Sequence, residues 1–150
     1  MYSESALRPA FPEGGHRVLR TLREKHFWFS YRRAAIARVA AECLRRGKNA
    51  RVLEFGCGDG DLLAALSERW WTVGLERSLD DLALARESGA RRLVAAEGSA
   101  PPFAGSFDLV GLFDVVEHVA DDVGLLRRAA ALVTPGGWVL VTVPADPRLW

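Results

Sequence analysis

Apolar positions in this chain follow two different spacings. Between residues 51 and 143, short apolar runs of five to seven residues alternate with longer segments in which apolar residues recur at every third or fourth position. The short runs indicate buried strands, and the longer segments indicate amphipathic helices. The pattern predicts strands at 51–55, 71–76, 92–96, 107–113 and 138–143, and helices at 61–69, 78–89 and 121–133.

Strands that are separated by helical segments pair in parallel and connect through right-handed crossovers. We therefore predict an α/β fold with a doubly wound parallel sheet of about five strands. Ser78 is the expected N-cap of the helix at 78–89, and Pro135-Gly136-Gly137 is expected to end the helix at 121–133. In such sheets, ligands bind beyond the carboxyl ends of the strands.

The N-terminal third of the chain predicts a helical segment in front of the sheet. Prolines and glycines between residues 9 and 15 indicate a flexible lead at 1–15, and residues 16–46 are expected to be largely helical. We expect one domain at 16–150, made of the helical segment 16–49 and a ligand-binding core at 50–150. One apolar stripe along the helix is predicted from Ile36, Val39, Ala40, Cys43 and Leu44.

The chain ends soon after the predicted fifth strand, which would leave that strand as an unprotected sheet edge. We therefore expect a truncated or short version of a larger fold. A homodimer that pairs two copies through this edge is the expected assembly.

Composition places the chain among ordinary globular proteins, because 49% of its residues are hydrophobic and 26% are charged. No apolar run reaches 18 residues, and residues 1–12 lack the pattern of a signal peptide. Cys43 and Cys57 have neither the spacing of a zinc site nor that of a disulfide framework. We expect a cytoplasmic protein without a metal site or a membrane span.

Charge is distributed unevenly along the chain. Residues 1–51 hold twelve Lys and Arg against four Asp and Glu, a net charge of +8, and residues 52–150 hold eight against fifteen, a net charge of −7. The basic segment either meets an anionic substrate or packs on the acidic remainder of the chain. The spread of its arginines along helix faces favours packing.

The stretch VLEFGCGDG at 52–60 carries the most informative chemistry. An apolar strand runs into Gly56, Gly58 and Gly60, and an apolar helix follows directly. Glycines let the backbone approach a ligand closely and take positive φ, and a helix N-terminus adds N–H donors and a positive partial charge. The turn therefore predicts a site for a small polar, nucleotide-like ligand, and the alternative is a tight turn that binds nothing.

The spacing of these glycines argues against a dinucleotide. A pyrophosphate-binding turn has the form Gly-x-Gly-x-x-Gly, whereas Gly60 comes one residue early and Asp61 stands in the expected place. Asp59 and Asp61 would both repel a pyrophosphate. A ligand with a positive centre and no phosphate suits this turn better.

Two further strand ends carry acids. Glu76 ends the second strand about 20 residues after the turn, where a carboxylate can accept hydrogen bonds from both hydroxyls of a ribose. Glu97 follows the third strand, where it or the adjacent backbone can meet the exocyclic amine of an adenine. The alternatives are a solvated strand-end acid for Glu76 and an exposed loop acid for Glu97.

Residues 113–119 follow the fourth strand and add aromatic and titratable groups. Phe113 can pack on a flat ring, while Asp114, Glu117 and His118 lie where a substrate would meet the ligand. His118 is the candidate general base, because a histidine titrates near neutral pH. The alternative is that Glu117 and His118 cap or orient the following helix.

Together these motifs resemble class I S-adenosylmethionine-dependent methyltransferases of the small-molecule type, which include quinone-biosynthesis enzymes. The resemblance implies a Rossmann-like sheet and S-adenosylmethionine as the cofactor. That family continues past the fifth strand with another helix and two further strands, which this sequence lacks. The resemblance runs from His26 to Pro147 and rests on the order and spacing of VLEFGCGDG (52–60), VGLE (73–76), PPFAGSFDLVGLFDVVEHV (101–119) and LVTPGGWVLVTVP (132–144).

The resemblance also implies roles for single residues. Glu76 would hold the ribose, Glu97 stands where the family often has Asp beside the adenine, and Phe113 falls where a residue of the fourth strand lines the pocket. The methionine part of the cofactor would be surrounded by Glu54, Gly56, Gly58 and Gly60.

The segment HFWFSYRR at 26–33 is similar to an aromatic and basic helix that closes over the cofactor in one branch of the family. Arg32 is the implied partner of the methionine carboxylate. Ordinary core packing is the alternative for Trp28 and Phe29.

The implied reaction is an in-line displacement that moves an activated methyl group to a small-molecule acceptor, with His118 as general base where the acceptor carries a proton. One alternative is a truncated, non-catalytic module of the same fold that binds a cofactor or assembles with other chains. A nicotinamide-dependent oxidoreductase is less favoured because of the glycine spacing. No nucleic-acid substrate is expected, because no Asn-Pro-Pro-Tyr-like segment follows the fourth strand.

Overall fold

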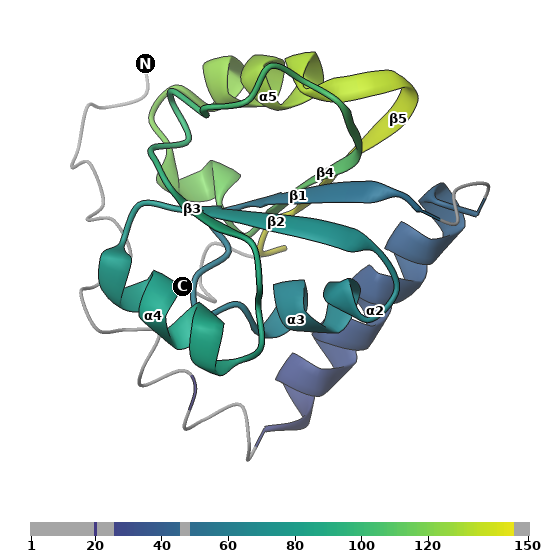
Figure 1. The fold of residues 1–150 in the computed structure, drawn as a ribbon, viewed down its shortest axis with the longest axis vertical. Coiled ribbons are helices and arrows are strands. Elements are labelled where there is room, and N and C mark those ends of the chain that lie inside the picture. Colours follow the sequence, from purple (N-terminus) through teal and green to yellow (C-terminus); the bar gives the residue numbers. More distant parts are fainter. Residues whose placement is uncertain (1–19, 21–25, 46–48, 146–150) are drawn as a thin grey trace.

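The computed structural model describes Arg20 and residues 26–45 and 49–145. Its centre is a five-stranded parallel sheet with the strand order β3-β2-β1-β4-β5 (Figure 1). This arrangement confirms the predicted α/β class and the parallel pairing. The strands are β1 (Arg51–Phe55), β2 (Trp71–Glu76), β3 (Leu93–Ala95), β4 (Phe107–Phe113) and β5 (Val133–Thr142).

Helices cover both faces of the sheet. One face carries α2 (Phe27–Cys43), α3 (Asp61–Ser67) and α4 (Leu79–Glu87), and the other carries α5 (Asp122–Ala131) (Figure 1). A short 3₁₀ helix, η1 (Val116–His118), lies between β4 and α5. The sheet is therefore doubly wound, as predicted.

Alternating side chains of the central strands build two apolar layers. Val52 of β1 packs with Ile36 of α2 on one face of the sheet. The next residue, Leu53, packs with Leu125 of α5 on the other face. Because both faces are covered, β1 reads as a continuous apolar run rather than an alternating one.

The predicted start of the fifth strand and end of the preceding helix are both wrong. α5 ends at Ala131, and Val133 already pairs with Phe107 of β4. The Pro135-Gly136-Gly137 segment therefore does not stop the helix. It forms a bulge inside β5, where the register with β4 shifts before Trp138 pairs with Leu109.

Two smaller boundary errors have a local cause. β3 is shorter than the predicted strand at 92–96, because only Leu93–Ala95 pairs with β2. α3 ends at Ser67 rather than at residue 69, and the Ser67 hydroxyl donates a hydrogen bond to the Ala64 carbonyl at 2.6 Å. Ser78 caps α4 as predicted, since its side chain accepts the Asp81 N–H.

α2 carries the predicted apolar stripe only in part. Ile36, Ala40 and Leu44 are buried at four-residue steps, whereas Val39 is 42% exposed. The narrower stripe means that α2 contacts the sheet along one line and leaves its flanks in solvent. The predicted lead at 1–15 and the helix start at residue 16 lie outside the described residues.

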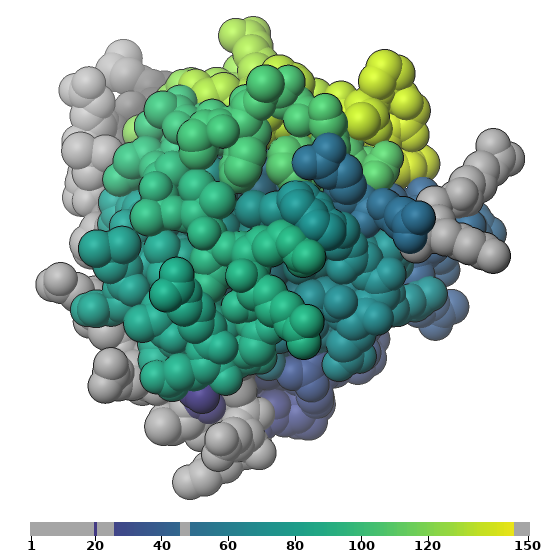
Figure 2. Space-filling model, in the orientation of Figure 1, coloured from purple at the N-terminus to yellow at the C-terminus, as the bar shows by residue number. Residues whose placement is uncertain are grey.

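β5 forms one edge of the sheet and pairs, within the described part of the chain, with β4 alone. In Figure 2 its yellow residues lie at one side of a surface that the teal and green residues of the middle of the chain cover. Trp138 and Val141 of this strand are exposed. Among the described residues, the outer side of β5 therefore has no partner strand.

Candidate functional site

A cavity of about 1170 Å³ lies at the carboxyl ends of the strands. It opens where the strand order reverses, between β1 and β4, which is where doubly wound sheets bind their ligands. Its walls come from the first turns of α2, the loops that follow β1, β2, β3 and β4, and the inner face of α5.

Gly56 and Gly58 of the glycine turn line the floor of this cavity, whereas Gly60, also predicted as a site residue, does not line it. Gly56, Gly58 and Gly60 all have positive φ, between 52° and 73°. A Cβ on Gly60 would also lie 2.7 Å from the Cβ of Ala85 in α4, so the turn packs against that helix without room for a side chain. The predicted sequence of a strand, a glycine turn and a helix start is confirmed, since β1 is followed by these glycines and then by α3.

Glu76 is held in place by the backbone. Its side chain is buried, and its two oxygens accept the N–H groups of Gly58 at 3.2 Å, Arg77 at 2.8 Å and Ser78 at 2.9 Å. A solvated strand-end acid, the alternative for this residue, is excluded. A carboxylate has about four acceptor positions, so among the described residues three are used, and one position remains for a ligand.

Buried acids surround the turn. Glu54 and Asp59 line the cavity and are 4% and 2% exposed. Burial raises the pKa of the Cys57 thiol well above its usual range, and the negative charges of Glu54 and Glu76 raise it further. Cys57 therefore stays protonated beside this cavity, whose negative potential suits a cationic ligand centre.

Arg32 connects α2 to the ends of two strands. Its Nη2 lies 2.6 Å from Oδ2 of Asp114 and 3.4 Å from Oγ1 of Thr142, and that hydroxyl donates to Asp114 at 2.9 Å. Asp114 has a positive φ of 58°, which is uncommon outside glycine. The cluster places a guanidinium on the cavity wall, where sequence reasoning expects the partner of a carboxylate.

The neighbouring Arg33 makes a second ion pair to the floor of the cavity. Its Nη1 lies 2.7 Å from Oδ1 of Asp61, the first residue of α3. Asp61 is therefore neutralised by α2, which weakens the argument that two acids repel a phosphate here. Asp59 and the buried Glu54 and Glu76 keep the floor acidic.

The first turn of α2 is aromatic and exposed. Trp28 lines the cavity, yet it is 52% exposed. Core packing, the alternative considered for Trp28 and Phe29, is therefore wrong for Trp28. Phe29 also lines the cavity and is half-buried.

The remaining predicted residues also reach the cavity. Glu97 and Phe113 line it, the first exposed and the second buried against the α2 side of the sheet. His118 lines it from η1 and is exposed. Glu117 and His118 do not cap the following helix, because the side chain of Asp121 caps α5; that they orient this helix stays an alternative.

Glu117 differs from the other acids. Neither of its carboxylate oxygens is exposed, and neither forms a hydrogen bond with another described residue. Burial raises the pKa of Glu117; its own backbone N–H and the charges of His118 and Arg32 lower it in part, while Asp114 raises it. Sequence reasoning noted this residue but had no signal for its burial.

The sequence analysis missed two residues of this region: Arg128, which lines the cavity, and Thr142, which contacts Arg32 and Asp114. Arg128 lies on α5 and lines the cavity. The sequence could have predicted this position, because Arg128 is three residues after the buried Leu125 and residues three apart share a helix face. Nothing local marks Thr142.

No cluster of three or more His, Cys, Asp or Glu side chains within the described residues can hold a metal ion. In the same part of the chain, no helix combines the length and apolar character that crossing a bilayer requires.

A doubly wound parallel sheet with a glycine turn and a strand-end acid at its switch point defines a nucleoside-binding α/β protein. The profile of the family described as "Methyltransferase domain" matches residues 26–149. The chain belongs to this methyltransferase family.

Known proteins agree with that assignment. The ubiquinone biosynthesis O-methyltransferase of Bordetella avium is 40% identical over 107 residues, which cover 65% of this chain and 44% of that protein. The chain spans about half the length of the curated relatives it matches.

Two solved structures share the fold. The sugar N-methyltransferase KedS8 from Streptoalloteichus has a TM-score of 0.72 at 25% identity, covering 100% of this chain and 61% of its own. The S-adenosylmethionine-bound CalS10, an amino pentose methyltransferase from Micromonospora echinaspora, has a TM-score of 0.68 at 28% identity. The match covers 78% of this chain and 51% of CalS10.

Proposed function

We propose that the chain binds S-adenosylmethionine in this cavity and transfers its methyl group to a small-molecule acceptor. The observation that carries the proposal is the buried carboxylate of Glu76, which the backbone of the glycine turn holds at the carboxyl end of β2. Membership of the methyltransferase family supports the choice of cofactor.

The charges around the cavity fit that cofactor. A sulfonium centre suits a floor that contains the buried acids Glu54 and Asp59, and an amino-acid carboxylate suits Arg32 on α2. The remaining acceptor position of Glu76 takes one ribose hydroxyl. Accepting both hydroxyls requires Glu76 to share or release one backbone N–H, because three are already bonded.

The residues of the chain position the reactants rather than react themselves. When bound, the cofactor supplies a methyl group already activated by the positive sulfur. Glu76 and Arg32 hold its two ends, and Trp28 and Phe29 on α2 exclude water from one side. Such positioning is worth on the order of 7–11 kcal/mol in ideal cases.

A general base is needed only when the atom that receives the methyl group carries a proton, as in a phenol or an amine. His118 is the proposed base for that step, since it lines the same cavity from η1. With the cofactor and an acceptor bound, His118 would take up the proton that the acceptor loses when it is methylated.

Binding is tested first, by calorimetric titration with S-adenosylhomocysteine. We expect Glu76→Gln to weaken the affinity about 10- to 100-fold, because the variant removes a charge-assisted hydrogen bond. Glu68→Gln, at an exposed position outside the cavity, is the matched control and keeps the wild-type affinity. A wild-type protein that does not bind S-adenosylhomocysteine at millimolar concentration refutes the proposed function.

Methyl transfer is tested next, with S-adenosylmethionine that carries a labelled methyl group. The acceptor panel contains phenols and amino sugars, because the relatives are named as an O-methyltransferase of ubiquinone biosynthesis and as a sugar N-methyltransferase. Label in the acceptor supports the proposal. Tight binding with no transfer to any acceptor supports the non-catalytic module instead.

A further inference from the structure

Arg128 places a positive charge on the cavity wall. It comes from α5, which covers the face of the sheet opposite to α2. It lies in the second half of α5 and its side chain is 31% exposed. Leu125, one turn earlier on the same helix face, packs near Gly98, since a Cβ on Gly98 would lie 3.4 Å from Leu125 Cδ1. Arg128 is therefore on the β3 side of the cavity.

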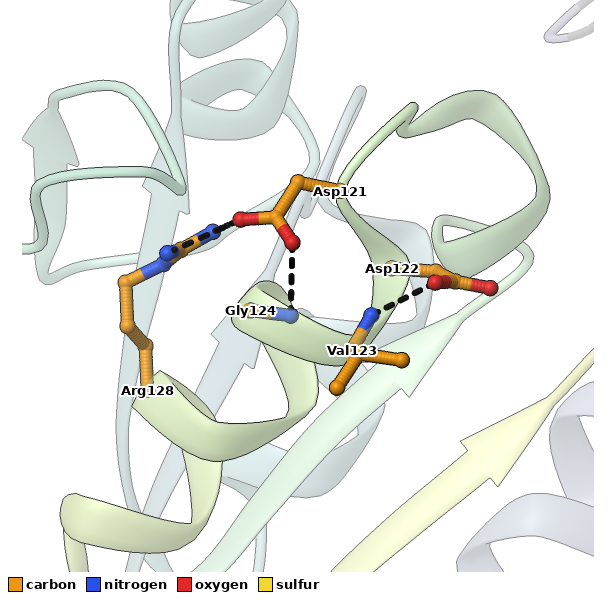
Figure 3. Close-up of polar contacts among 5 residues, drawn as sticks. All are labelled: Asp121, Asp122, Val123, Gly124 and Arg128. Carbon is orange, nitrogen blue, oxygen red and sulfur yellow. Dashed lines mark hydrogen bonds and ion pairs between the residues drawn. The ribbon is translucent and has the colours of Figure 1, made fainter.

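Asp121 controls where this guanidinium lies. Its Oδ1 accepts the Gly124 N–H at 2.9 Å, and its Oδ2 lies 3.4 Å from both Nη1 and Nη2 of Arg128 (Figure 3). Any Cβ on Gly124 would overlap the Asp121 carboxylate. The N-cap of α5 and the arginine are thus held by one carboxylate.

The ion pair between Arg128 and Asp121 is too weak to explain the position of Arg128 by its contribution to stability. The Arg128–Asp121 pair is long at 3.4 Å, and the Asp121 side chain is 67% exposed, so the pair contributes little to folding. The Nε–H of Arg128 is buried and has no acceptor among the described residues. Several of its five N–H donors therefore remain uncommitted at a cavity wall.

The position of Glu76 decides which part of a ligand Arg128 meets. With the ribose at Glu76, at the end of β2, the base extends toward the next strand, β3, and the loop at Glu97 and Gly98. We propose that the Arg128 guanidinium contacts the purine ring of the bound cofactor and sets its preference for a purine. This inference rests on the proposed function.

The chemistry of the two groups is complementary. A guanidinium is planar, stays charged, and stacks on aromatic faces. The ring nitrogens of adenine are acceptors, which the donors of Arg128 can meet. Lysine has neither the plane nor the fork of donors, so the contact is specific to arginine.

The test compares two ligands and three methionine variants by titration calorimetry. S-adenosylhomocysteine has the purine and the amino-acid carboxylate, whereas 5′-methylthioadenosine keeps the purine and lacks the carboxylate. We expect Arg128→Met to weaken both ligands equally, by about five- to thirtyfold. Arg128→Lys recovers only part of the loss.

The controls lie at matched positions. Arg127→Met, at the exposed neighbouring residue outside the cavity, keeps wild-type affinity for both ligands. Arg32→Met weakens S-adenosylhomocysteine and leaves 5′-methylthioadenosine unchanged. Equal melting temperatures of the ligand-free variants show that each is folded.

Two results overturn the inference. Wild-type affinity of Arg128→Met for S-adenosylhomocysteine removes any contact with the cofactor. A loss for S-adenosylhomocysteine but not for 5′-methylthioadenosine places Arg128 at the other end of the ligand. Failure of the wild-type protein to bind either ligand refutes the proposed function itself, and this result is distinct from the two that overturn the role of Arg128.

Discussion

At the scale of the residue, two glutamates of this protein differ in the hydrogen bonds that their carboxylates form. Glu76 is buried, and its carboxylate accepts three backbone N–H groups. Glu117 precedes the cavity-lining His118, and its carboxylate oxygens have no hydrogen bond to another described residue. The two glutamates therefore differ in whether the fold supplies hydrogen-bond donors to their carboxylates.

This difference makes stability depend on pH through Glu117. Because burial raises its pKa, the native state keeps the proton to a higher pH than the unfolded chain does. The stability from this group is fully present below the ordinary glutamate pKa, about 4.3, and is lost as pH rises through the raised native value.

We expect Glu117→Gln, which mimics the protonated acid, to melt at a higher temperature than the wild type at about pH 8. The gain shrinks as pH falls toward the ordinary glutamate pKa, about 4.3, because the wild-type carboxyl becomes protonated as well. Melting curves measured by circular dichroism at several pH values check this. Glu68→Gln, at an exposed site, gives a difference that does not change with pH; a similar flat profile for Glu117→Gln would contradict the argument.

At the scale of the element, α2 is attached to the site by charge as well as by its apolar stripe. Arg32 pairs with Asp114 at the end of β4, and Arg33 pairs with Asp61 at the start of α3. Both pairs are partly exposed, so each contributes little to global stability. Their effect is local, because they hold the aromatic first turn of α2 at the cavity.

We expect Arg33→Met to speed dissociation of S-adenosylhomocysteine about two- to fivefold, since a partly exposed ion pair is worth roughly 0.2–1 kcal/mol. Stopped-flow tryptophan fluorescence measures this rate, with Trp28 beside the cavity as the reporter. Arg38→Met removes an exposed pair with Glu42 further along α2 and leaves the rate unchanged. If both variants dissociate at the wild-type rate, the Arg33–Asp61 pair does not hold α2 in place.

At the scale of the molecule, the described sheet has two edge strands, β3 and β5, and β5 is the longer of the two. β5 pairs with β4 alone among the described residues, and Trp138 and Val141 are exposed along it. An apolar edge with unpaired N–H and C=O groups is a template for another strand.

We expect two copies of this chain to associate through β5, with a sedimentation coefficient that rises with protein concentration. Val141→Lys reduces this association, because a charged side chain on an edge strand opposes pairing. Val123→Lys, at another exposed valine on α5, does not reduce it. Sedimentation velocity checks the expectation, and a single monomeric species at every concentration argues against it.

Apolar runs in the sequence predicted the strands that are buried on both faces of the sheet. The bounds of β1, β2 and β4 agree with the apolar runs in the sequence, because strands covered on both faces are apolar along their whole length. The bounds of β3 and β5 were wrong, because an outer strand ends where its neighbour stops pairing. The Pro135-Gly136-Gly137 bulge is a result of that pairing.

The sequence by itself determined the bounds of β1, β2 and β4, the glycine turn and the acid that ends β2, since each depends on residues close together in the chain. The tertiary structure alone decided the contact of Arg32 with Asp114, the burial of Glu117 and the place of Arg128 on the cavity wall. These features need elements distant in sequence to meet across the sheet. Local sequence patterns do not predict these contacts, because the charge state and hydrogen bonds of a side chain depend on the neighbours that the fold brings to it.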